Sequence, residues 1–122
     1  MDSTQQPATQ VVVELSGCSA HDAHAVFRVL GRSFASDRTD DDVPHDAAGG
    51  RPTVWTSTID VAELRAEAEP MHLTAPVMAA VQGGYWAVDR LRDVLAAAFA
   101  VEDEGMAAGD QEKEVELRLA SR

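Results

Sequence analysis

The sequence has little cysteine and no long apolar run. Cys18 is the single cysteine, so the chain cannot form an internal disulfide, which is typical of proteins in a reducing compartment. No apolar run approaches the ~20 residues that a membrane-spanning helix needs. Residues 1–10 show neither the basic start nor the apolar segment of a signal peptide. We therefore expect a cytoplasmic protein that does not bind a membrane.

Basic residues are also scarce. Ten Lys and Arg residues stand against 21 Asp and Glu residues, which gives a net charge of −11. Nucleic acids attract proteins through clustered cations, so we expect no nucleic acid among the partners. Five acidic residues lie within 37–46 and seven within 102–116. Each acidic run is either a solvated surface or a docking surface for a basic partner.

Apolar residues make up 45% of the 122 residues, which is enough for the core of one domain. We expect a flexible arm over residues 1–10 and a single α/β domain over residues 11–122. Alternating and β-branched apolar residues predict strands. The segments concerned are 11–15, 53–61, 75–84, 100–105 and 114–120.

Helical spacing of apolar residues predicts two helices. The first begins after Ser19, a good N-cap, and its apolar stripe runs to Phe34. The second covers residues 85–99. Residues 36–52 lack periodicity and contain Pro, Gly and Asp, which predicts an acidic, mobile loop. Residues 62–72 read as a short acidic connector.

Two parts of the chain resemble each other. After a one-residue slip, the apolar positions of 11–35 match those of 76–100, and Gly17 matches Gly83 at the strand–helix turn. Each copy continues to a late strand, so the half-repeats are 11–61 and 75–120. Two strand–helix–strand halves on one antiparallel sheet predict an α+β ferredoxin-like sandwich with both helices on one face. Coincidence between two amphipathic units is the alternative.

The opening VVVELSGCSAHDAHAVFRVLGRSFA with its later TVWTSTIDV resembles short uncharacterised streptomycete proteins built on one βαβ unit. The closing LRDVLAAAFAVEDEGMAAGDQEKEVELRL is similar to the end of other such streptomycete proteins. The resemblance implies an actinobacterial α/β protein, and it implies no catalytic residues.

Cys18, His21 and His24 are spaced at intervals of three, and imidazole and thiolate are ligands of zinc, nickel and copper. Three ligands do not close a structural site, so His45 or His72 would have to complete it. The alternative is a capped helix with two surface histidines and a buried cysteine. We favour this alternative and assign no metal site.

No catalytic or cofactor-binding residue is identified. Gly83 and Gly84 open a helix after a strand, but the dinucleotide and P-loop patterns are absent, so a tight turn is favoured. The open face of a ferredoxin-like sheet would carry Glu14 and Asp60, which are the first candidates for proton transfer if the protein is an enzyme. The sequence leaves that question open.

Trp86 is the one residue that we predict to bind a partner. On a helical projection it lies opposite Leu91 and Leu95, on an otherwise polar face. It either packs under loops or contacts a partner, because aromatic residues are common at interfaces. The leading hypothesis is a small acidic accessory module that acts as a homodimer or through a partner protein. The alternatives are a ligand-binding protein or enzyme that uses the sheet face, and a weak metal binder.

Overall fold

A computed structural model describes residues 8–37 and 54–122. Within these two ranges, two helices and six strands follow one another. Their bounds are β1 (Gln10–Ser16), α1 (Ala20–Ser33), β2 (Ala35–Ser36), β3 (Trp55–Asp60), β4 (Val77–Gly84), α2 (Tyr85–Ala98), β5 (Phe99–Ala108) and β6 (Glu112–Ser121). Most of the expected arm (1–10) and mobile loop (36–52) lies outside the described residues. Gln10, at the end of that arm, already belongs to β1.

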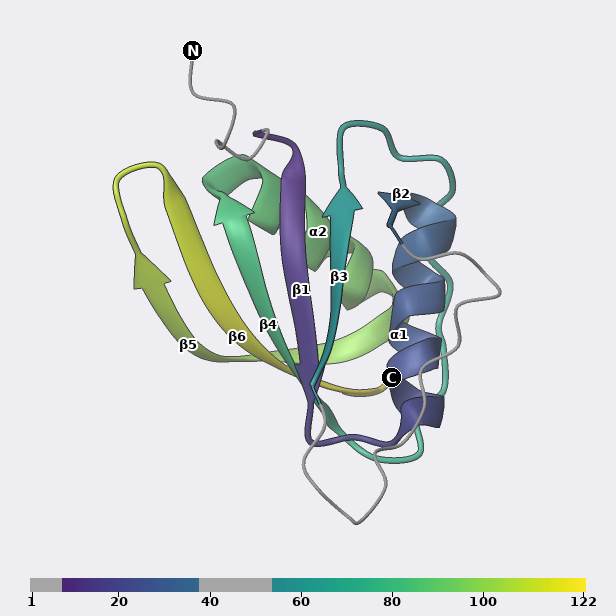
Figure 1. Ribbon diagram of the computed structural model, residues 1–122. Coiled ribbons are helices and arrows are strands. Elements are labelled where there is room, and N and C mark those ends of the chain that lie inside the picture. Colours follow the sequence, from purple (N-terminus) through teal and green to yellow (C-terminus); the bar gives the residue numbers. More distant parts are fainter. Residues whose placement is uncertain (1–7, 38–53) are drawn as a thin grey trace.

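All six strands form one antiparallel sheet in the order β2-β3-β1-β4-β6-β5. The chain divides into two β-α-β-β halves, one from β1 to β3 and the other from β4 to β6 (Figure 1). In each half the helix joins two strands that run in the same direction, and the last strand of the half lies between them. The first strands of the two halves, β1 and β4, pair at the middle of the sheet.

The predicted α+β class, with an antiparallel sheet and two helices, is confirmed. The ferredoxin-like topology is not confirmed by the strand order, because each half has three strands, with an additional strand between its helix and its last strand. The strand predicted over 100–105 lies within β5, but the continuation to Ala108 was not predicted, because β5 is exposed over most of its ten residues. β2 was not predicted, because it has only two residues.

The two helices repeat one another closely. Each has 14 residues and ends at an extended phenylalanine, Phe34 after α1 and Phe99 after α2. In each case the phenylalanine N–H donates to the carbonyl oxygen of a leucine four residues earlier, Leu30 or Leu95. The two halves therefore share the way in which their helices end, as well as an apolar pattern, and their origin by duplication stays a prediction.

One face of the sheet packs on the helices. Alternate residues of the four long inner strands are buried there, and the residues between them are exposed or half-buried. The buried residues include Trp55 and Ile59 on β3 and Leu117 on β6. The side chains on the other face of the sheet remain accessible. Among the described residues, therefore, no helix covers that face.

The close approach of β1 explains why a glycine stands at position 83, just before α2. A Cβ at this position would lie 2.9 Å from the carbonyl oxygen of Gln10 and 3.4 Å from Cα of Val11. Both atoms belong to the backbone of β1, which cannot move without disturbing the centre of the sheet. We therefore expect Gly83→Ala to lower the free energy of unfolding by about 2 kcal/mol. Urea unfolding measures this loss; Gly31→Ala, whose Cβ would meet nothing within 4 Å, is the control.

Candidate binding surface

The connector between β3 and β4, residues 61–76, contains no helix or strand. It is tied to both helices: the N–H of Arg65 donates to the carbonyl of Ser33 on α1, and the N–H of Met71 donates to that of Ala98 on α2. Farther on, the N–H of Leu73 donates to the hydroxyl of Ser121 at 2.7 Å. The connector is therefore held against the helix layer.

Asp22 ties the N-terminal end of α1 to this connector. The expected cap is confirmed, since Ser19 Oγ accepts a hydrogen bond from the N–H of Asp22. The Asp22 carboxylate, however, accepts bonds from the N–H of Thr74 at 2.9 Å and from its hydroxyl at 2.6 Å. Burial alone would raise the pKa of this carboxyl group. The bonds from Thr74 and from the N–H of Ala75 outweigh burial, so the pKa of Asp22 lies below its ordinary value.

Arg90 on α2 is held by neutral groups. Its Nε donates to the carbonyl oxygen of Val61 at 2.7 Å. Its guanidinium carbon lies 5.9 Å from the ring centre of Phe34 and 5.4 Å from that of Trp86. Among the described residues, no carboxylate lies within ion-pair distance of this guanidinium. Arg90 thus keeps donors available while its position is fixed by a carbonyl and two rings.

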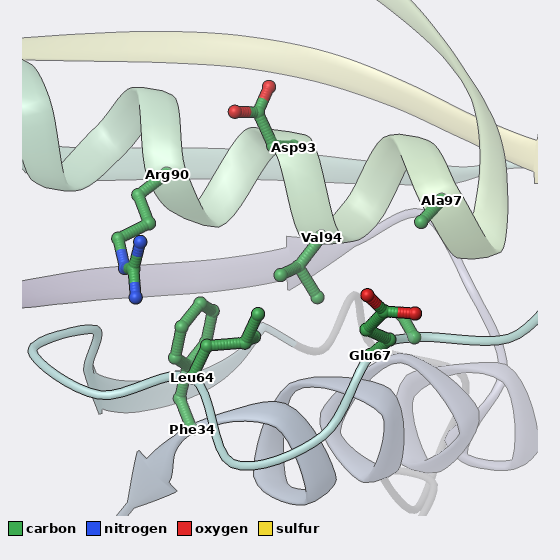
Figure 2. A pocket seen from close by; sticks show the side chains of 8 residues that line it. Phe34, Leu64, Glu67, Arg90, Asp93, Val94 and Ala97 are labelled. Atoms are coloured by element: carbon green, nitrogen blue, oxygen red, sulfur yellow. The ribbon is translucent and has the colours of Figure 1, made fainter.

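A cavity of about 360 Å³ opens beside Arg90, between α2 and the connector. Its size is at the lower end of the range for small-ligand sites. In Figure 2, Arg90 lies at one end and Glu67 toward the other, with Leu64, Phe34 and Val94 between them. The lining residues are Phe34, Leu64, Glu67, Ala68, Arg90, Asp93, Val94 and Ala97. The middle of the cavity is therefore apolar, and its ends are charged.

Trp86 contacts Arg90, which lines this cavity. Its side chain is 55% exposed, so it does not pack under a loop. Leu64, which lines the cavity, is 42% exposed. We call Leu64, Trp86 and Arg90 together the Trp86 surface. The helical projection that identified Trp86 also places Arg90 beside it, four residues later on α2. The sequence could not place Leu64 there, because the connector has no periodic pattern.

Tyr85 has a structural role at the start of α2. Its hydroxyl donates a hydrogen bond to the carbonyl oxygen of Gly109, and Lys113 Nζ lies 5.5 Å from the centre of its ring. Tyr85 therefore links the start of α2 to the β5–β6 turn.

The structure describes four of the five candidate metal ligands, namely Cys18, His21, His24 and His72. His21 is exposed, His24 is half-buried on α1, and Cys18 is half-buried before the helix. Within 8–37 and 54–122, no group of three His, Cys, Asp or Glu side chains is placed to hold a metal ion. His72 instead approaches Ser121, and His45 lies outside the described residues.

The two candidate acids of the sheet face are not placed as a general base would be. Glu14 is exposed on β1, and Asp60 is half-buried at the end of β3. The Asp60 carboxylate accepts a hydrogen bond from the N–H of Ala62 at 2.9 Å and so caps the turn that follows β3.

No protein-family model matches the chain, and comparison with curated proteins and with solved structures finds no similar protein. These comparisons do not test the resemblance to streptomycete proteins, which stays a prediction. In the part of the chain that the structure describes, neither helix has the length and apolar character needed to cross a membrane.

Proposed function

We propose that the protein is an accessory module that binds a partner protein, or a second copy of itself, through the Trp86 surface. The observation that carries this proposal is the exposure of Trp86, which is 55% accessible while its ring is held against Arg90. A large aromatic side chain that is both exposed and fixed loses little conformational freedom when a partner covers it.

The neighbours of Trp86 support the same proposal. Tryptophan and arginine are the residue types most enriched among those that dominate the energy of protein interfaces. Leu64 and the apolar lining of the adjacent cavity would receive a side chain of the partner. Arg90 would donate to a carbonyl or carboxylate of that partner. We further propose a cytoplasmic location, which the single cysteine supports.

Trp86→Ala is expected to weaken partner binding about 30-fold, because a residue at the centre of an interface contributes ~2 kcal/mol or more. The free energy of unfolding should change by less than about 0.5 kcal/mol, because the side chain is mostly exposed. Light scattering over a range of protein concentrations measures self-association. Isothermal calorimetry measures binding to a partner isolated from the native host.

Met106→Ala is the matched control for this experiment. Met106 is 67% exposed and lies on β5, away from the Trp86 surface. Its replacement should leave association unchanged. Equal weakening by the two substitutions would mean that exposed apolar area in general, and not the Trp86 surface, drives association, and the proposal would then be wrong.

A further inference from the structure

The uncovered face of the sheet is a second surface, separate from the Trp86 surface. Figure 1 looks onto the sheet with α2 behind it. Along β1, β3, β4 and β6 the outward residues are exposed or half-buried, which shows that neither helix covers them. The chemistry of this face is set by which outward residues the strand register brings side by side.

Three glutamates, Glu112, Glu114 and Glu116, point outward in succession from β6 and are all exposed. We call them the glutamate row. Alternate residues of a strand lie about 7 Å apart on one face. Glu14 on β1 faces the same way and is paired in register with Ala80, which is itself paired with Glu116. Glu14 and Glu116 are thus separated by two strand spacings, roughly 10 Å.

Between these acids runs the outward side of β4, where Ala80, Gln82 and Gly84 lie opposite the glutamate row. On the other side of the row, β5 places Ala107 opposite Glu114 and Gly105 opposite Glu116. We call the outward side of β4, with the acids on both sides of it, the β4 strip. Its central residues are small or neutral, so no large or charged side chain of β4 separates the acids on its two sides. At one end of the strip, the carbonyl oxygen of Ala8 would lie 3.5 Å from a Cβ at Gly84.

Among the residues that the structure describes, no cation forms an ion pair with the carboxylates of the strip. Opposite charges on facing strands normally stabilise a sheet, and none faces the glutamate row. The single lysine, Lys113, turns to the helix side and pairs with Asp89 at 2.7 Å. Arg118 lies on the open face, but it is directed to Glu102, at 3.9 Å. Among the described residues, neither the glutamate row nor Glu14 has an ion-pair or side-chain hydrogen-bond partner.

We propose that the β4 strip binds an extended segment of a partner protein that carries Lys or Arg at alternate positions. Alternate side chains of an extended segment repeat at the same ~7 Å as the glutamate row, so each cation would meet one carboxylate. The net charge of −11 attracts such a segment from a distance and repels nucleic acid and anionic membranes. This surface adds a second partner chemistry to the proposed function and does not depend on the Trp86 surface.

The test uses two synthetic hexapeptides with blocked ends and equal charge. One alternates lysine and serine, and the other carries three lysines followed by three serines. Binding of each to the full chain is followed by NMR through the backbone amides. We expect the alternating peptide to bind about fivefold more tightly, and the shifted amides to lie on β1, β4 and β6.

Glu114→Gln combined with Glu116→Gln should weaken binding of the alternating peptide about tenfold. The control combines Glu63→Gln with Glu69→Gln, which removes the same charge from exposed positions on the connector. The control should change affinity less than about twofold, because exposed charges at a distance are screened by salt. All four positions are exposed and glutamine has the shape of glutamate, so both variants should fold, as circular dichroism would verify.

Three results would overturn the proposal. If both double variants weakened peptide binding equally, the overall negative charge of the protein alone would explain the binding. If the two peptides bound with equal affinity, the spacing of the lysines would not matter, and the proposed match to the glutamate row would be wrong. Spermine that binds the strip as tightly as the alternating peptide would indicate a site for small cations. None of these results bears on the Trp86 surface, so failure here and failure of the proposed function are distinguishable.

Discussion

Phe99→Ala is expected to lower the free energy of unfolding by about 4 kcal/mol, as is typical when alanine replaces a fully buried phenylalanine. Phe99 is 1% exposed and ends α2, so its ring fills space between that helix and the sheet. A domain of this size is stable by ~5–15 kcal/mol, so the loss is a large share of the total. Chemical unfolding followed by circular dichroism measures it.

The two helices end in the same way, so the loss of stability can also be measured at the equivalent phenylalanine after α1. Phe34 is 0% exposed and occupies the same place after α1, so Phe34→Ala should cost a similar amount. If either alanine variant fails to fold, Phe34→Leu and Phe99→Leu provide the comparison at a smaller loss. A loss below about 1 kcal/mol at both positions would contradict the packing of the helix ends described here.

Asp22→Ala is expected to cost about 3 kcal/mol at neutral pH. The carboxylate is 1% exposed and accepts two hydrogen bonds from Thr74, and each bond to a charged group contributes ~1.5–3 kcal/mol. The substitution would release the connector from the start of α1. Glu63→Ala, at an exposed position on the same connector, is the control and should change stability by less than about 0.5 kcal/mol.

The pH dependence of stability identifies the charge of Asp22 as the cause. A carboxyl group whose pKa is lowered by folding stabilises the protein above its unfolded pKa, about 3.9. That contribution is lost as the pH falls through the lower folded value. The difference in unfolding free energy between the wild type and Asp22→Asn should therefore be largest near neutral pH and shrink below about pH 4. A constant difference from pH 7 to pH 2 would contradict this account.

The sequence predicted the parts of the fold whose apolar residues follow a period. Both helices, the inner strands and the buried side of each strand appear as expected, and so does the cap at Ser19. Of the two strands after the helices, β5 was predicted only over 100–105, because it is mostly exposed, and β2 was missed, because it has only two residues. The strand order depends on these two strands, which explains why a ferredoxin-like arrangement was expected.

The candidate surfaces were predicted less completely than the fold. A local pattern sufficed for Trp86, since the helical projection alone sets it apart from the apolar stripe. The contacts of Arg90 with Phe34 and Val61 join residues far apart in the sequence, and no local pattern indicates them. The same holds for Asp22, whose partner Thr74 is 52 residues away. The outward position of the glutamate row was predictable from the alternation along β6. The residues that lie opposite the row were not predictable, because they depend on the register of β4, β5 and β6.

The most direct test of partner binding through the Trp86 surface is photo-crosslinking in the native host. A photoreactive phenylalanine analogue would replace Trp86 in one sample and Met106, which is also exposed, in the other. We predict one discrete crosslinked product from position 86, either a dimer of the chain or a complex with one partner, and none from position 106. No product from position 86, or the same products from both positions, would contradict the account.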